Sequence, residues 1–276
     1  MKNRENTLKN AKLILCDIDG TLYDWSRVLS PVTFETIQQL HEKGYKIGLA
    51  SGRPYEELCL YAKEWGFNFD FDVIIGLNGG EIYDLEKNQL FEYYKLSTDV
   101  LKEICEMMMR FTCNPFMYWH QKILGLHMDD MLIKSSKTSN REIVIANDLS
   151  DLYSEENIKI MFRMTEQEVK KVEEYLLEHP SNQYIGLKTQ STLIEFMDPR
   201  ISKGFAVNEL CKLGNYKKEE ILAFGDTTND NSMLQEAGWG VCLQNGSDDT
   251  KAIADEITEL PCSKDGFAQY IRKNLL

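Results

Sequence analysis

Residues 12–21 read KLILCDIDGT, an apolar run that ends at two aspartates. A strand covered on both faces reads as a continuous apolar stretch, so residues 12–16 are predicted to form a buried strand. Asp17 and Asp19 follow it directly. In open α/β sheets, ligands bind beyond the carboxyl ends of the parallel strands. The stretch therefore predicts an α/β fold with a ligand site that contains Asp17 and Asp19.

The same succession of strand and helix recurs further along the chain. Short apolar runs, which predict buried strands, alternate with segments whose apolar residues have helical spacing. The further predicted strands are 46–50, 73–77, 221–224 and 240–243, and the predicted helices are 31–43, 58–65, 203–213, 230–237 and 248–255. Strands that alternate with helices form parallel βαβ units, so the sequence predicts a doubly wound, Rossmann-like parallel sheet.

This rhythm changes in the middle of the chain. The segments EIYD and LFEYYKL predict a hairpin-like pair around residues 85–89. Further on, helices are predicted over 98–110 and 165–178, short mixed segments at 115–120, 124–128 and 143–148, and a strand pair within 184–197. We therefore expect residues 1–84 and 187–276 to form one core domain, and residues 85–186 to form an inserted α+β domain.

The composition limits the classes of partner. The chain has 276 residues, 43% of them hydrophobic, which is typical of a packed globular protein. Its 31 Lys and Arg against 44 Asp and Glu give a net charge of −13. Nucleic acids and anionic membrane surfaces attract positive charge, so neither is an expected partner.

Cysteine content and hydropathy indicate the compartment. Seven cysteines, without a CxxC pair, argue against a disulfide framework and against a zinc ribbon. No stretch approaches the 18 apolar residues of a membrane span, and the first residues lack the apolar core of a signal peptide. We expect a cytoplasmic protein, and leave open whether it is a monomer or a homodimer.

A second acidic group, Gly225-Asp226-Thr227-Thr228-Asn229-Asp230, follows another predicted strand. Capping of the next helix would account for one of its aspartates, and an Asp-rich turn would account for Asp17 and Asp19. Neither interpretation requires four carboxylates at one edge of a sheet, where they would repel one another if unpaired. A hard divalent cation with oxygen ligands, Mg²⁺ first, would offset that repulsion.

Two further groups are candidates for binding an anion. Ser51-Gly52-Arg53 follows the second predicted strand, where a hydroxyl and backbone N–H groups at a helix start favour an anion, although Ser-Gly is also a common turn. Ser202-Lys203-Gly204 begins a predicted helix, where a lysine opposes the helix dipole. Lys203 is therefore either a solvated side chain or a cation aimed at a phosphate.

In their order along the chain, these four groups of residues resemble the motifs of the haloacid dehalogenase superfamily of phosphohydrolases. The long insert resembles the α+β cap, type C2B, of its Cof-type subgroup. The matching stretches are LILCDIDGTL, GLASGRP, IIGLNGG, ISKG, AFGDTTNDNSML and AGWGVCLQNGSDDTKAIADEIT. The departure is at Thr227 and Thr228, because the family more often has Asn directly after the first Asp of this motif.

The resemblance implies a Mg²⁺-dependent phosphatase of small phosphorylated metabolites, either sugar phosphates or phosphorylated cofactors. Asp17 would be the nucleophile that forms an aspartyl-phosphate. Asp19 would protonate the leaving oxygen and then activate water. Mg²⁺ would be held by Asp17, the backbone carbonyl of Asp19 and Asp226, and Asp230 would orient the metal site.

The remaining roles that the resemblance implies concern phosphate and substrate. Side chains expected to bind the phosphoryl group are Thr21, Ser51, Lys203 and Asn229. Candidates for contact with the leaving group are Gly52, Arg53, Asn78, Tyr118 and His120. Packing within the insert is the alternative for Tyr118 and His120, and a structural ion pair is the alternative for Arg53. A phosphomutase acting on sugar phosphates and a binding protein without activity remain alternative functions.

Overall fold

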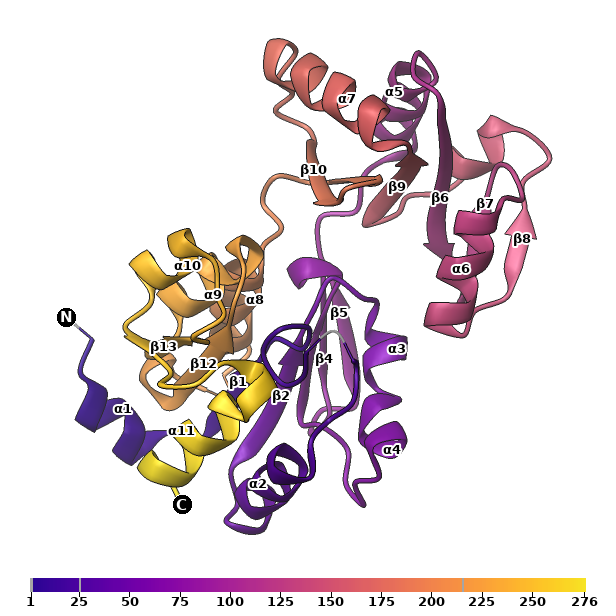
Figure 1. Ribbon diagram of the computed structural model, residues 1–276. Coiled ribbons are helices and arrows are strands. Elements are labelled where there is room, and N and C mark those ends of the chain that lie inside the picture. Colours follow the sequence, from indigo (N-terminus) through magenta and orange to yellow (C-terminus); the bar gives the residue numbers. More distant parts are fainter. Residues whose placement is uncertain (1, 25, 215) are drawn as a thin grey trace. The chain divides into compact units, whose positions relative to one another are not determined.

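The computed structural model describes residues 2–24, 26–214 and 216–276. The chain divides into two compact units (Figure 1). The core unit is Met1–Phe91 with Ile201–Leu276, and the insert unit is Glu92–Arg200. Each unit has its own sheet and its own hydrophobic core.

The division lies several residues from the boundaries expected from the sequence, which are 85 and 186. β5 (Gln89–Glu92) lies beside β4 (Glu81–Asp84) in the sheet of the core unit, so the first hairpin stays with the core sheet. β10 (Ile185–Gln190) pairs with β11 (Leu193–Met197), which in turn pairs with β9 (Lys159–Met164). The second hairpin is therefore part of the sheet of the insert unit.

The core unit is built on an eight-stranded sheet in the order β14-β13-β12-β1-β2-β3-β4-β5. Its other strands are β1 (Leu13–Cys16), β2 (Lys46–Ala50), β3 (Val73–Gly76), β12 (Ile221–Gly225), β13 (Trp239–Cys242) and β14 (Glu256–Ile257). The pairs from β14 to β3 are parallel, and β3 pairs with β4 antiparallel. The predicted doubly wound α/β fold is confirmed, with an antiparallel hairpin added at one edge.

Helices cover both faces of the core sheet (Figure 1). One face packs against α2 (Pro31–Glu42), α3 (Tyr55–Leu58), α4 (Tyr61–Trp65) and α11 (Gly266–Asn274). The other face carries α8 (Lys203–Lys212), α9 (Asn231–Glu236) and α10 (Asp248–Ile253), and the short helix α1 (Arg4–Asn10) contacts β12. Among the described residues, no helix combines the length and the apolar character needed to cross a membrane.

Local signals explain most of the helix boundaries, with one exception. Ser30 caps α2 by accepting a hydrogen bond from the backbone N–H of Thr33 at 3.0 Å, and Gly44 follows the helix with a φ of 86°. The single helix predicted over 58–65 is wrong, because the chain forms the two short helices α3 and α4. Between them the N–H of Leu60 bonds to the carbonyl of Glu57, three residues back, so the α-helical pattern is interrupted.

The insert unit has a six-stranded sheet in the order β10-β11-β9-β6-β7-β8. Its remaining elements are β6 (Cys113–Trp119), β7 (Lys122–Gly125), β8 (Ile143–Ile145), α5 (Thr98–Met108), α6 (Asp130–Ser139) and α7 (Glu166–Glu178). The predicted helices over 98–110 and 165–178 are observed as α5 and α7. α6 was not predicted, because its sequence DMLIKSSKTS has few apolar residues. At the two ends of the unit, the guanidinium of Arg200 lies 3.8 Å from the centre of the Tyr94 ring.

The position of β1 explains where a site can form in the core unit. β1 pairs with β2 on one side and with β12 on the other, so the order of the strands reverses there. Open α/β sheets bind ligands at this switch point, beyond the carboxyl ends of the strands. The side chains of β1 are almost completely buried, so this central strand is firmly held.

We predict that truncating the centre of β1 destabilises the core unit. Leu15 is 0% exposed, so Leu15→Ala leaves a cavity and lowers the free energy of unfolding by about 2–5 kcal/mol. Leu60→Ala is the matched control, because Leu60 is 48% exposed and its loss changes stability by less than about 0.5 kcal/mol. Urea unfolding measures both variants, and equal losses would contradict the buried position of β1.

Candidate active site

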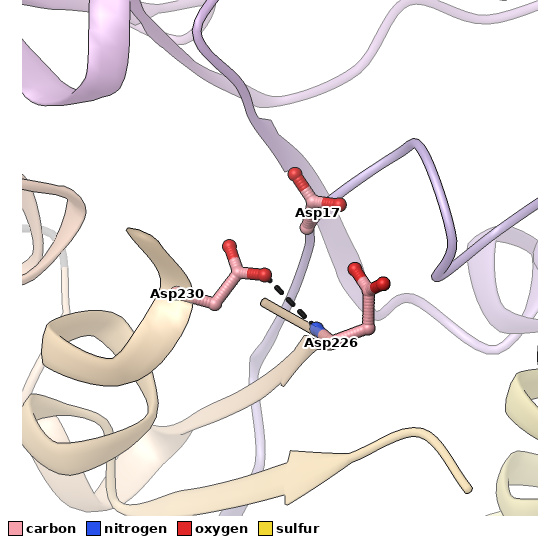
Figure 2. A group of neighbouring side chains, drawn as sticks. All are labelled: Asp17, Asp226 and Asp230. Carbon is pink, nitrogen blue, oxygen red and sulfur yellow. Dashed lines mark hydrogen bonds between the residues drawn. The ribbon is translucent and has the colours of Figure 1, made fainter. Parts of the chain in front are cut away.

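The site begins where β1 and β12 end side by side. The N–H of Asp17 donates to the carbonyl of Phe224 at 2.9 Å, which extends the pairing of β1 with β12 by one residue. Asp226 follows the last residue of β12. The side chains of Asp17 and Asp226 therefore leave the sheet at adjacent strand ends (Figure 2).

Three carboxylates meet at this edge of the sheet. Oxygen atoms of Asp17, Asp226 and Asp230 all lie within 4.8 Å of one another (Figure 2). All three side chains are buried. A fourth aspartate expected in this group, Asp19, directs its carboxylate elsewhere, as described below.

A buried lysine joins two of the three carboxylates. Lys203 Nζ lies 2.6 Å from Asp17 Oδ1 and 2.6 Å from Asp230 Oδ1. Lys203 is 0% exposed, so the interpretation of this residue as a solvated lysine is wrong. The interpretation as a cation directed into the site agrees with the geometry.

A glycine lets Lys203 reach this position. Lys203 is the first residue of α8, and the N–H of Gly204 donates to Ser232 Oγ of α9 at 3.0 Å. A Cβ atom at Gly204 would lie 2.5 Å from the carbonyl oxygen of Ser232, which is too close for any side chain. The contact between α8 and α9 thus brings Lys203 next to Asp230, just before α9.

Asp230 uses both carboxylate oxygens within the protein. Oδ1 binds Lys203, and Oδ2 accepts hydrogen bonds from the N–H of Asp226 at 2.9 Å and of Thr227 at 3.1 Å. The predicted capping of the next helix is wrong for Asp230, which precedes α9 without a side-chain capping bond; its carboxylate instead accepts from the N–H of Thr227 and closes the 3₁₀ turn Thr228–Asp230. This carboxylate holds the loop after β12 in place and offsets the charge of Lys203, which leaves Asp17 and Asp226 as the better donors to a cation.

Burial and mutual repulsion shift the protonation of the carboxylates. Burial, together with the charge of Asp230, raises the pKa of Asp17 to about 8. The same causes raise the pKa of Asp226 to about 7. For Lys203, burial lowers the pKa, but the charges of Asp17 and Asp230 outweigh it and leave the pKa above its usual value. One cation among three carboxylates leaves an excess of negative charge.

The loop after β1 wraps closely around Asp226. Gly20 has a φ of 87°, and a Cβ atom there would lie 2.2 Å from Asp226 Oδ2. Both the backbone conformation and the close approach therefore require glycine at this position. Thr21 Oγ1 donates to Asp226 Oδ1 at 3.3 Å. Thr21, expected to bind phosphate, contacts this carboxylate in the structure.

Two other loops meet near this edge. The N–H of Asn78, after β3, donates to the carbonyl of Ser51, after β2, at 2.9 Å. Asn78 Oδ1 also accepts a hydrogen bond from Asn229 Nδ2 at 3.4 Å, and a Cβ at Gly52 would lie 3.2 Å from the same oxygen. The structure thus brings together Ser51, Gly52, Asn78 and Asn229, four of the residues singled out in the sequence.

Asp19 is held separately by Arg53. Arg53 Nη2 lies 3.0 Å from Asp19 Oδ1 and 2.7 Å from Asp19 Oδ2. Arg53 also contacts Tyr23, Tyr61 and Glu57. Sequence reasoning did not find these three partners. No local pattern pointed to them, because Arg53 precedes the first residue of α3, and Tyr23 and Tyr61 lie in the loop after β1 and on α4.

The two candidates in the insert unit have partners within that unit. The guanidinium of Arg141 lies 5.2 Å from the centre of the Tyr118 ring, and Tyr118 packs on the cluster around Phe116. His120 lies in the exposed turn after β6, where its Nε2 is 3.1 Å from Glu155 Oε1. The contacts of Tyr118 agree with packing within the insert, whereas the side chain of His120 is 67% exposed and is not packed. The role of both residues in substrate binding stays a prediction.

The geometry defines a class of chemistry. A buried carboxylate beside a lysine can attack an electrophile that carries negative charge, because the lysine reduces the charge repulsion. The neighbouring carboxylates offer the oxygen donors that a hard cation prefers. Such a constellation fits displacement at a phosphoryl group.

The comparisons with known proteins agree with this geometry. The family model for haloacid dehalogenase-like hydrolases matches residues 14–271. The chain therefore belongs to the haloacid dehalogenase-like hydrolase family, and the expected family and its hydrolase class are confirmed.

Individual relatives match along their whole length. The 5-amino-6-(5-phospho-D-ribitylamino)uracil phosphatase YitU of Bacillus subtilis is 25% identical over 264 residues, which cover 95% of this chain and 96% of YitU. The pyridoxal phosphate phosphatase YbhA of Escherichia coli is 24% identical, over 96% of this chain and 99% of YbhA. A solved haloacid dehalogenase-like hydrolase from Bacteroides thetaiotaomicron superposes with a TM-score of 0.83 at 27% identity, over 95% of this chain and 99% of that one.

We predict that the stability of the metal-free protein falls as the pH rises from about 4 to 8. The folded state keeps protons on Asp17 and Asp226 up to pH values of about 8 and 7, whereas unfolded aspartates release them near 3.8. The folded state therefore binds more protons in this window, and the free energy of unfolding decreases with pH. Urea unfolding in a chelator at pH 5 and pH 8 measures the change.

Asp226→Asn provides the comparison for this pH dependence. The variant lacks one of the two carboxylates, so its loss of stability between pH 5 and 8 is smaller than that of the parent by about 1 kcal/mol or more. Asp70→Asn, which changes an exposed carboxylate, keeps the parent dependence. An identical pH dependence in Asp226→Asn and in the parent would contradict the assignment.

Proposed function

We propose that this hydrolase is a Mg²⁺-dependent phosphatase of small phosphorylated metabolites that works through an aspartyl-phosphate on Asp17. The observation that carries the proposal is the contact of Asp17 with Lys203, inside a group that also contains Asp226 and Asp230. A nucleophilic carboxylate and a buried cation are the two parts that attack on a phosphate requires from the protein.

The carboxylates of the site fit a divalent cation. Within the described residues, Oδ2 of Asp17 and Oδ2 of Asp226 accept no hydrogen bond, while Asp230 is fully engaged. Burial, and after it the charge of Asp230, raises the pKa of Asp17 and of Asp226, so a cation beside them would stabilise their charged forms. We propose that Asp17, Asp226 and the backbone carbonyl of Asp19 hold Mg²⁺. When bound, the ion would polarise the phosphoryl oxygens and weaken the repulsion between the substrate and Asp17.

The first half of the reaction transfers the phosphoryl group to the protein. An oxygen of Asp17 attacks phosphorus, and the bond between phosphorus and the ester oxygen breaks. The carboxyl group of Asp19 gives its proton to the leaving oxygen, which departs as an alcohol. Lys203 offsets negative charge on Asp17 and on the phosphoryl oxygens, and Ser51 and Asn229 supply hydrogen-bond donors to those oxygens.

The second half returns the phosphoryl group to water. The carboxylate of Asp19 takes a proton from a water molecule, whose oxygen attacks phosphorus. The bond between phosphorus and Asp17 breaks, inorganic phosphate leaves, and both aspartates return to their starting forms. Asp19 thus acts as acid and then as base, as in other two-step hydrolases.

The class of substrate is supported by the relatives. YitU and YbhA are named for phosphate esters of two different heterocyclic metabolites. We propose that this chain likewise acts on a phosphorylated metabolite, and that the insert unit, the counterpart of the predicted cap, selects the leaving group. A panel that contains sugar phosphates, pyridoxal phosphate and the ribitylamino-uracil phosphate tests this choice.

Asp17→Asn is expected to abolish hydrolysis. The amide is a poor nucleophile, so phosphate release with Mg²⁺ falls by at least about 10³-fold on an aryl phosphate and on every active member of the panel. Asp70→Asn, at an exposed position of the core unit, is expected to keep the parent rate. A colorimetric phosphate assay measures both, and full turnover by Asp17→Asn would exclude the mechanism.

Removal of Mg²⁺ is expected to affect both activity and stability. Chelator-treated protein should release no phosphate, and added Mg²⁺ should restore release and raise the melting temperature. At a hundredfold excess over its dissociation constant, a bound ion stabilises a protein by about 2.7 kcal/mol. Asp226→Asn should lose both responses, and parent turnover in the chelator would argue against the metal.

A further inference from the structure

The side chain of Arg53 holds the carboxylate of Asp19 in place. It lies in the loop after β2, and its side chain is only 15% exposed. Its Nη2 contacts both oxygens of the Asp19 carboxylate, at 3.0 and 2.7 Å. Within the described residues, Arg53 is the hydrogen-bond and ion-pair partner of that carboxylate, whose side chain is 36% exposed.

The guanidinium itself is held from several directions. Nη1 donates to the hydroxyl of Tyr23 at 3.2 Å and to the hydroxyl of Tyr61. Nε lies 3.4 Å from Glu57 Oε1, and the Tyr61 ring centre lies 5.5 Å from the guanidinium carbon. Burial lowers the pKa of Arg53, but the charge of Asp19 and the neighbouring tyrosines raise this pKa by more than burial lowers it. The guanidinium therefore stays charged.

Aromatic packing fixes the partners of Arg53 in turn. The Tyr61 ring stacks on Trp65 at 5.0 Å between centres, and Tyr23 meets the same Trp65 edge-on at 6.0 Å. Tyr23 is also tied to the loop that carries Asp19, because its carbonyl accepts the N–H of Gly20 at 2.8 Å. These contacts therefore join the loop after β1 to α3 and α4, and they restrict the movement of the side chains involved.

We propose that Arg53 is a positioning residue that fixes the carboxylate of Asp19 for proton transfer to the leaving group and from the attacking water. One nitrogen, Nη2, contacts both carboxylate oxygens, while Nη1 and Nε are bound to other protein groups. The guanidinium therefore cannot turn, and it holds the carboxylate in one orientation, which a flexible lysine ammonium would not do. This inference rests on the proposed phosphatase function. It differs from the substrate contact expected for Arg53, since Nε, Nη1 and Nη2 are all directed at protein groups.

The proposed role of Arg53 predicts an effect on the rate that depends on the leaving group of the substrate. Esters with a poor leaving group, such as a sugar phosphate, need a proton from Asp19 as the bond breaks. An ester with a good leaving group, such as p-nitrophenyl phosphate, leaves as a stable anion and needs that proton much less. Hydrolysis of the aspartyl-phosphate also uses Asp19 and is common to both kinds of substrate, so the difference appears in kcat/KM, which reports the first transfer. Loss of a positioning residue for Asp19 should therefore reduce kcat/KM on the first kind of substrate and spare it on the second.

The test compares Arg53→Ala with Asp19→Asn on both kinds of substrate in the full-length protein. We expect Arg53→Ala to lower kcat/KM at least about tenfold on the most active sugar phosphate and less than about threefold on p-nitrophenyl phosphate. Asp19→Asn should show the same bias to a larger degree. Arg272→Ala, which removes an arginine that links α11 to α2 and does not contact Asp19, is the matched control and should leave both rates unchanged.

A double variant tests whether Arg53 acts through Asp19. If it does, Arg53→Ala combined with Asp19→Asn is no slower than Asp19→Asn alone. Arg53→Lys and Tyr61→Phe, which keep the charge or remove one hydroxyl, should show a weaker form of the same bias, and they serve if Arg53→Ala does not fold.

Three results would overturn the proposal. These are an equal loss of kcat/KM on both substrates, an equal rise in KM at constant kcat on both substrates, and losses of kcat/KM that multiply in the double variant. Failure of the phosphatase function has a different signature, because the parent protein itself would then release no phosphate from any ester. That result would remove the proposed function and the role of Arg53 together.

Discussion

The structure of the core unit depends on one buried positive charge, that of Lys203, which lies between the carboxylates of Asp17 and Asp230. An ammonium or a carboxylate left alone in a protein interior costs several kcal/mol, so Lys203, Asp17 and Asp230 each depend on the others. The surrounding backbone is arranged to allow this contact. Gly204 lets α8 approach α9, and the amides after β12 hold the second oxygen of Asp230. Breaking one member would leave the others buried without a partner.

The same group explains why the site suits a cation despite containing a lysine. If all three carboxylates were ionised, one ammonium would leave an excess of negative charge; burial and this repulsion raise the pKa values of Asp17 and Asp226. With the proposed metal ion bound, an acidic protein could bind an anionic ester, because the ion and Lys203 together would reverse the sign of the local field. Most of the net charge of −13 has no part in this and lies on the surface.

Sequence reasoning located this site because its signals are local. An apolar run followed by Asp is visible at Asp17 and again at Asp226, and parallel strand topology brings such ends together. The partners of Arg53 could not be found in this way, since Tyr23 and Tyr61 meet only through tertiary packing. Helix α6 was missed because its sequence is polar, and the break between α3 and α4 carries no proline or glycine to announce it.

The pairing of Tyr94 with Arg200 has a consequence for how the chain folds. Asp17 and Lys203 are separated by 186 residues, and contacts between such distant segments are slow to form because closing a long loop costs entropy. The insert unit has its own core, and the contact of Tyr94 with Arg200 holds its two ends together. Once the insert unit has folded, its more than a hundred residues have their two ends close together. The two segments of the core unit are then connected as if by a short loop. Early folding of the insert would thus speed assembly of the core sheet, and with it the meeting of Asp17 and Lys203.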